Sequence, residues 1–138
     1  MSRSHRISRE KRHTFWDNSL APVLHIAPGD EVYFETLDAS NGQVTPDSTA
    51  EAVRHIDFDD INPVTGPVHV EGAEPGDALK ITILDFAPSG WGWSANIPDF
   101  GLLADDFPEP YMHHWHYPPD WPRPFPMKAA MQRCRSSR

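Results

Sequence analysis

Fifteen prolines interrupt this chain of 138 residues, and proline at this density excludes long helices. Two of them share one local pattern, at 28-PGDEVYFETL-37 and at 75-PGDALKITILDF-86. Proline fixes φ and glycine supplies a positive φ, so Pro28 and Gly29 suit the two central positions of a type II turn. Each corner leads into alternating apolar and polar residues, the pattern of a half-buried strand. These features predict an all-β fold, a sandwich or barrel of jelly-roll type with long loops.

We expect strands over residues 21–26, 31–37, 68–71 and 78–86. At most one or two short helices are expected, one of them after residue 48. Asp47 or Ser48 would form its N-cap, with Glu51 as the capping-box partner of Ser48.

Charge divides the chain into a basic start, an acidic middle and a basic end. Residues 1–12 and 123–138 hold ten of the 12 basic residues, whereas residues 13–122 hold two basic residues against 19 acidic ones, a net charge of −17. Such a field repels phosphate and favours cations, so we expect no nucleic-acid partner. We expect a flexible arm over 1–12, a β domain over 13–117 and a proline-rich, then disordered, tail over 118–138.

Two further features concern the compartment. No apolar run approaches the roughly 20 residues of a membrane span, and the basic start has no apolar stretch of a secretory signal, so no membrane partner is expected. The one cysteine, Cys134, excludes an internal disulfide and fits a reducing compartment. A cytoplasmic location is therefore expected.

The loop 38-DASNGQVTPDSTAE-51 concentrates oxygen-bearing side chains after a predicted strand, where functional sites are often placed. Asp38, Asn41, Gln43 and Asp47 are of the types that hold Ca²⁺ or share a transition metal with histidines. The simpler interpretation is turn chemistry, because Asp-Ala-Ser-Asn-Gly favours turns without any ligand.

Histidines form a second group of candidates. In 113-HHWH-116, His114 and His116 would share a face of a strand, as two nitrogen ligands of zinc do, although an aromatic rim of a pocket or subunit contact explains the motif better. His13, His55 and His69 are interpreted as packed or surface residues. Cys134 and the serines lack the setting of a nucleophile, so water activated by a metal or a carboxylate is the favoured route for any hydrolysis.

Four stretches together resemble the acetamidase/formamidase family: 13-HTFWDNSLAPVLHIAPGDEVYFETLDASNGQVTPDST-49, 62-NPVTGPVHVEGAEPGDALKITILDF-86, 91-WGW-93 and 98-PDFGLLADDFPEPY-111. The resemblance implies a mostly β, oligomeric protein that hydrolyses short linear amides such as formamide and acetamide to ammonia and a carboxylate. It also implies a bound divalent metal, zinc or calcium, which would activate water.

The resemblance also suggests roles for individual residues. Asp38 and Asp47 would be catalytic, and Gln43, Phe100 and Gly101 would contact the substrate. Asp38, Gln43 and His13 would be metal ligands, with further ligands expected from a missing C-terminal half.

This sequence departs from the family in two respects. Family members are about twice as long, and the pattern stops after 123-RPFP-126, so we expect a truncated or C-terminally altered product. Position 69 is commonly aromatic in the family, whereas here it is His69.

An incomplete fold would leave apolar residues such as Leu79, Ile81 and Ile83 uncovered. We therefore expect a homo-oligomer or a complementing chain that carries the other half. The alternative to an amidase is a non-catalytic β module that docks to a partner chain or binds metal only.

Overall fold

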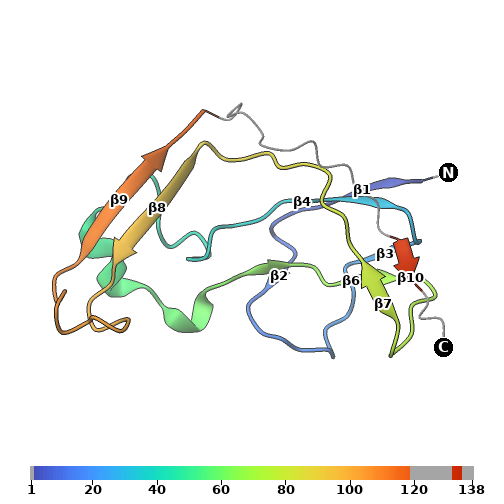
Figure 1. The fold of residues 1–138 in the computed structure, drawn as a ribbon, viewed down its shortest axis with the longest axis horizontal. Coiled ribbons are helices and arrows are strands. Elements are labelled where there is room, and N and C mark those ends of the chain that lie inside the picture. The colour runs from blue at the N-terminus through green and yellow to red at the C-terminus, as the bar shows by residue number, and fades with distance from the viewer. Residues whose placement is uncertain (1, 119–131, 135–138) are drawn as a thin grey trace. The chain divides into compact units, whose positions relative to one another are not determined.

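The computed structural model describes residues 2–118 and 132–134 of the chain (Figure 1). The described residues form ten short strands and two 3₁₀-helices. The strands are β1 (Ser4–Ile7), β2 (Arg12–His13), β3 (Leu24–Ile26), β4 (Glu31–Phe34), β5 (Val64–Thr65), β6 (Val68–Val70), β7 (Ala78–Lys80), β8 (Trp91–Asn96), β9 (Tyr111–His116) and β10 (Gln132–Cys134); the helices are η1 (Ala50–His55) and η2 (Phe58–Asp60). The prediction of an all-β fold with at most two short helices is confirmed. No helix in the described part of the chain is long and apolar enough to cross a membrane.

The described chain forms two compact units, between which it passes at residues 37/38, 62/63 and 85/86. The first unit contains the parallel pairs β1–β4 and β3–β6 and the antiparallel pairs β2–β5 and β7–β10. The second contains η1, η2 and the antiparallel pair β8–β9, whose register joins Trp91 to His116 and Asn96 to Tyr111.

The two Pro-Gly-Asp corners are built alike. In the first, the Asp30 amide donates to the Ala27 carbonyl at 3.1 Å, and in the second the Asp77 amide donates to the Glu74 carbonyl at 3.0 Å. The central glycines have φ values of +91° and +97°, as a type II turn requires. Each aspartate also closes its corner, since its Oδ2 accepts the amide of the residue three positions earlier at 3.1 Å. The first type II turn was predicted, and it is confirmed.

Each unit has a small apolar centre. Ile7, Ile26 and Val70 are buried in the first unit, and Val44 and Val53 are buried in the second. Within the β3–β6 pair, Ile26 and Val70 are register partners, so one face of this pair is covered. Because side chains alternate along a strand, the residues next to them point to the opposite face.

Most predicted strands are present but shorter than expected. The clearest difference is the predicted strand 78–86, of which Ala78–Lys80 alone is a strand, β7. A strand extends only as far as a neighbouring strand pairs with its backbone, and β10 pairs with three residues of β7. Leu79, Ile81 and Ile83 are 51%, 64% and 45% exposed.

The short helix after residue 48 is present, but its predicted cap is wrong. η1 begins at Ala50 with Thr49 as N-cap, and no side chain caps it. The Ser48 hydroxyl instead accepts a hydrogen bond from the Thr45 amide at 3.0 Å, in a turn before the helix. A local side-chain bond of this kind competes with helix capping.

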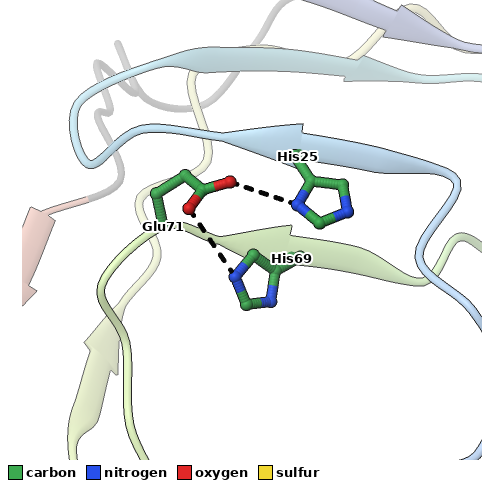
Figure 2. A group of neighbouring side chains, drawn as sticks. All are labelled: His25, His69 and Glu71. Atoms are coloured by element: carbon green, nitrogen blue, oxygen red, sulfur yellow. Dashed lines mark hydrogen bonds and ion pairs between the residues drawn. The ribbon is translucent and has the colours of Figure 1, made fainter.

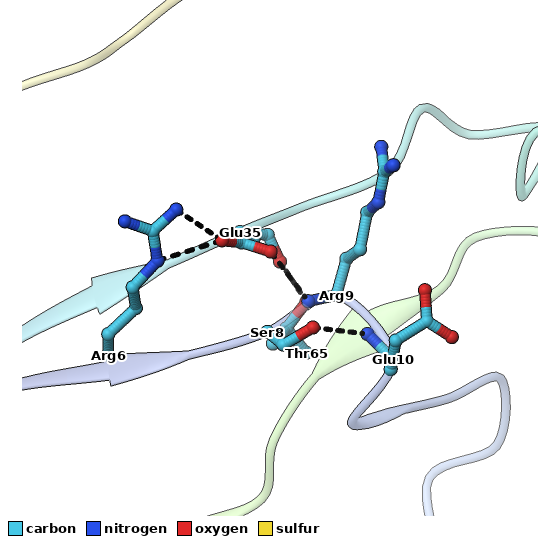
Figure 3. A network of polar contacts seen from close by, with 6 residues as sticks. All are labelled: Arg6, Ser8, Arg9, Glu10, Glu35 and Thr65. Atoms are coloured by element: carbon cyan, nitrogen blue, oxygen red, sulfur yellow. Dashed lines mark hydrogen bonds and ion pairs between the residues drawn. The ribbon is translucent and has the colours of Figure 1, made fainter.

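The start of the chain is part of the first unit, which corrects the expected flexible arm over residues 1–12. β1 pairs in parallel with β4, and Ile7 is buried. Figure 3 shows the polar contacts around this pair: Glu35 accepts hydrogen bonds from the Arg6 guanidinium and from the Arg9 amide at 3.4 Å. The Thr65 hydroxyl donates to the Glu35 carbonyl at 2.7 Å.

These contacts join the start of the chain to acidic side chains at the two ends of β4, Asp30 before it and Glu35 after it. Asp30, for example, accepts the Arg3 amide at 2.9 Å and contacts His5 Nε2 at 3.1 Å. The expected tail over 118–138 lies largely outside the described residues. Of that segment beyond residue 118, the structure describes β10, which pairs with β7.

Candidate functional site

The predicted loop site begins with Asp38, whose carboxylate organises the turn that follows it. Oδ1 accepts the Gly42 amide at 2.9 Å. Oδ2 accepts the Ser40 amide at 3.2 Å, the Ser40 hydroxyl at 2.6 Å and the indole N–H of Trp93 at 2.8 Å. Asn41 and Gly42 have φ values of +57° and +82°, a conformation that asparagine and glycine tolerate better than other residues. The turn chemistry expected from the sequence is present here.

The contacts of Asp38 determine its protonation. Burial raises its pKa, but hydrogen bonds from Ser40, Trp93 and Gly42 outweigh burial, so the pKa lies below its ordinary value. The carboxylate is therefore held ionised. Oδ2 accepts three of the four hydrogen bonds and Oδ1 accepts one, so Oδ1 keeps the spare lone-pair capacity of this carboxylate.

Gln43 is engaged at both ends of its side-chain amide. Its Nε2 donates to the carbonyls of Asp57 and Asp60 at 3.1 and 3.0 Å, and its Oε1 accepts the Asp57 amide at 2.7 Å. Gln43 thus joins the predicted loop to the segment that contains η2. The sequence did not reveal this contact, because the partners are backbone groups 14 and 17 residues away.

Asp47 differs from both of these residues. It is exposed, and its carboxylate forms no hydrogen bond or ion pair with the part of the chain that the structure describes. Its two oxygens are therefore accessible to water or to a small ligand. The sequence predicts that Asp38 and Asp47 share a site. Their carboxylates differ, because the oxygens of Asp38 accept hydrogen bonds from the protein and those of Asp47 accept none from the described residues.

The predicted substrate-wall residues lie in the same unit. Phe100 is 61% exposed and packs obliquely against the ring of Phe58, with centroids 5.3 Å apart. Gly101 has a φ of +102° and has open space where a side chain would stand. Together with η2, these residues present an accessible aromatic surface.

The HHWH motif lies on β9, as expected for a strand. The indole N–H of Trp91 donates to Nδ1 of His114 at 3.1 Å, so this nitrogen carries no proton and Nε2 must donate to the Ser48 carbonyl at 2.8 Å. Both nitrogens of His114 are therefore occupied, which argues against zinc ligation by His114 and His116. The ring stacks on Trp91 with centroids 5.8 Å apart. His113 and Trp115 form a second ring contact, at 4.3 Å.

His13 belongs to the first unit and ends β2. Its Nδ1 contacts the Phe15 carbonyl at 2.8 Å. Both ends of the Gln43 amide are bonded to the backbone, whereas Asp38 Oδ1 accepts a single hydrogen bond and keeps lone-pair capacity for a cation. Oδ1 of Asp38 is therefore the atom of this loop that could hold the implied ion.

A different group of metal-ligand side chains comes together in the first unit. Figure 2 shows His25 on β3 and His69 on β6 next to one another, with the carboxylate of Glu71, which follows β6, pointing toward both. His25 Nδ1 lies 3.1 Å from Glu71 Oε1, and His69 Nε2 lies 4.0 Å from Glu71 Oε2. One ligand atom from each residue lies within 4.8 Å of the other two.

Sequence reasoning missed this group. The sequence pattern predicts His69 to be a packed or surface residue and indicates no role for His25 or Glu71. One sequence feature could have indicated the group: LHI at 24–26 and VHV at 68–70 are similar, and each places a histidine between two apolar residues. Local patterns do not reveal that the two strands are neighbours in register.

Comparison with known proteins supports a single family. The Acetamidase/Formamidase family matches residues 1–122. The formamidase of Methylophilus methylotrophus is 36% identical over 111 residues, which cover 76% of this chain and 27% of that protein. The acetamidase of Mycolicibacterium smegmatis is 32% identical over 129 residues, which cover 84% of this chain and 32% of that protein.

A solved structure agrees with these sequence matches. The crystal structure of an acetamidase from Bacillus halodurans superposes with a TM-score of 0.71 at 35% identity, and the match covers 80% of this chain and 37% of that chain. The chain thus spans between about a quarter and two fifths of the length of these relatives. Because the family match extends over most of the sequence, this chain belongs to the acetamidase/formamidase family.

Proposed function

We propose that this chain is part of a hydrolase that cleaves the C–N bond of short linear amides, such as formamide and acetamide. Membership of the acetamidase/formamidase family over residues 1–122 is the observation that carries the proposal. The names of the relatives, formamidase and acetamidase, support amides as the substrate class. A cytoplasmic location is part of the same proposal.

The chemistry requires a water molecule to add to the amide carbonyl carbon. A C–O bond forms, the C–N bond breaks, and the nitrogen leaves as ammonia after it takes up a proton; the carboxylate is the second product. A base must accept the proton of the attacking water. We assign this role to Asp47, because it is exposed and its oxygens have no partner in the described part of the chain.

Asp38 would act differently under this proposal. Its low pKa and four donors make it a poor base, but the same contacts connect the loop to Trp93 of β8. We therefore assign Asp38 the role of positioning the loop. Gln43 would support it from the other side through the backbone of Asp57 and Asp60.

A small uncharged substrate suits the surroundings of this loop. Residues 13–122 carry a net charge of −17, which disfavours anionic substrates. Phe100 and Phe58 offer an apolar surface for the short alkyl group of an amide, with Gly101 leaving space beside them. A divalent zinc or calcium ion remains part of the family-based expectation. When bound it would supply Lewis-acid polarisation of the carbonyl.

Association with another chain is the second part of the proposal. Several apolar side chains of the first unit are exposed in β7 and just after it, namely Leu79 at 51%, Ile81 at 64% and Ile83 at 45%. Groups of exposed apolar residues are typical of interaction surfaces. They favour a homo-oligomer or a complementing chain, and they also support the alternative function, a non-catalytic β module that docks to a partner.

The test is ammonia release from formamide and acetamide by the purified chain, with and without a chelator. Asp47→Asn should lower kcat by about a hundredfold or more, as expected for loss of a general base. Asp105→Asn, which alters another exposed carboxylate of the same unit, should leave the rate unchanged. If the unsubstituted chain releases no ammonia from either amide, the enzymatic proposal is overturned for this chain and the docking module is favoured.

A further inference from the structure

We propose that His25, His69 and Glu71 form a binding site for a divalent transition metal, with zinc as the best-fitting ion. The site belongs to the first unit and uses no residue of the loop assigned to amide hydrolysis. It is therefore proposed as a site in addition to the catalytic one.

The backbone holds the two histidines side by side. β3 and β6 pair in parallel, and His25 and His69 are direct register partners. Their neighbours Ile26 and Val70 are 1% and 7% exposed, so these anchor the pair from one face. Because side chains alternate, both imidazoles project from the other face, and their ring centroids are 4.8 Å apart.

Glu71 is positioned by the same ladder. Its amide donates to the Ile26 carbonyl at 2.8 Å, which continues the β3–β6 pairing one residue beyond β6. Two residues after His69, it lies on the same face of the strand. The carboxylate then reaches both imidazoles, at 3.1 and 4.0 Å (Figure 2).

The spacing suits a tetrahedral ion. Zinc bonds of about 2.0–2.1 Å place ligand atoms about 3.3 Å from one another in a tetrahedron. The three ligand atoms here lie within 4.8 Å, so small side-chain rotations are sufficient to close the site. Such rotations are sterically accessible, because the side chains of His25 and Glu71 are each 59% exposed and that of His69 is 41% exposed.

The donor set selects the kind of metal. Two imidazole nitrogens and one carboxylate oxygen favour zinc and similar transition metals over calcium and magnesium, which prefer oxygen ligands alone. The acidic surroundings of the chain add a general attraction for cations. The competing explanation is an ion pair between Glu71 and protonated histidines without any metal.

The experiment is titration of metal-free protein with Zn²⁺ by calorimetry, using a chain that carries no polyhistidine tag. We expect one Zn²⁺ ion per chain to bind through these three residues, and a loss of affinity of about tenfold or more at this site in each of His25→Ala, His69→Ala and Glu71→Gln. The control is His55→Ala, which removes a 76% exposed histidine of η1 that also pairs with a glutamate. It should bind as the unsubstituted chain does.

A second readout separates coordination from loose binding. Co²⁺ in place of Zn²⁺ should give visible absorption bands of tetrahedral coordination, which the three variants lose and His55→Ala keeps. Urea unfolding of the metal-free proteins shows whether each variant is folded. Equal Zn²⁺ affinity in the three variants and the control, or no Zn²⁺ binding by the unsubstituted chain, would overturn the proposal and favour the ion pair.

Discussion

The indole N–H of Trp93 donates a hydrogen bond to Oδ2 of Asp38 at 2.8 Å, across 55 residues of sequence. This bond joins the loop after β4 to the strand β8, which belongs to the same compact unit. It is charge-assisted, because Asp38 is held ionised by its other donors. The loop conformation therefore depends on a residue from a distant part of the chain.

Trp93→Phe removes this donor and keeps an aromatic ring. We expect the free energy of unfolding to fall by about 1–2 kcal/mol, in the range of a partly exposed hydrogen bond to a charged group. The matched control is Trp115→Phe, which removes an indole bond to the neutral Ser94 hydroxyl on the same strand pair. Its loss should be about 0.5–1 kcal/mol. Urea unfolding measures both, and a larger loss in the control would contradict the charge-assisted bond.

Asp30 should make stability depend on pH in the acid range. Hydrogen bonds from the amides of Arg3 and Ala27 and from His5 lower the pKa of Asp30 to about 2. An unfolded aspartate has a pKa of about 3.9, so the ionised carboxylate stabilises the fold above about pH 4. This contribution is lost as the pH falls through about 2.

Asp30→Asn tests this dependence. The variant should unfold at lower urea concentration near neutral pH, and its midpoint should fall less than that of the parent between about pH 4 and pH 2. Asp105→Asn changes an exposed carboxylate of the second unit and should follow the parent curve. Parallel curves for Asp30→Asn and the parent would show that Asp30 has no depressed pKa.

The corner glycines should be sensitive to substitution for a purely backbone reason. Gly29 and Gly76 have φ values of +91° and +97°, and an added Cβ would meet no atom within 4 Å. Alanine at either position should therefore cost about 1–2 kcal/mol of unfolding free energy, the strain of a left-handed backbone. Gly92→Ala is the control, since Gly92 also has open space but has no φ in that range. It should be neutral or stabilising, and an equal loss at Gly92 would argue against backbone strain.

The contact between Arg6 and Glu35 should be salt-sensitive. Hydrogen bonds from Arg6 and the Arg9 amide lower the pKa of Glu35, and the Arg6 guanidinium also lies over the ring of Tyr33 at 4.8 Å. A double-mutant cycle with Arg6→Gln and Glu35→Gln should give a small favourable coupling. The coupling should shrink from about 0.1 M to 1 M salt, because the Debye length falls from about 10 Å to 3 Å.

The Arg12–Glu10 pair provides the comparison for this cycle. Its N–O distance is 3.6 Å and the Glu10 side chain is 75% exposed, so its coupling should be near zero at every salt concentration. Coupling between Arg6 and Glu35 that does not change with salt would mean that packing, rather than charge, joins β1 to β4.

Local chemistry was readable from the sequence in several places. The Pro-Gly-Asp corner predicted a type II turn, and the Asp-Ala-Ser-Asn-Gly stretch predicted a turn around Asp38; both depend on residues within four positions of each other. The cap of η1 was the local exception, because the Ser48 hydroxyl has an alternative partner in Thr45. The all-β class followed from proline density and alternation, which need no knowledge of distant contacts.

The sequence by itself therefore determined the turns, the fold class and the family resemblance. The tertiary structure alone decided that His25 meets Glu71 across 46 residues, that β1 pairs with β4, and that Oδ2 of Asp38 accepts the indole N–H of Trp93. The physical reason is that a turn is encoded by adjacent residues, whereas strand register depends on which distant apolar faces bury one another. His25 and His69 are neighbours because Ile26 and Val70 are buried side by side.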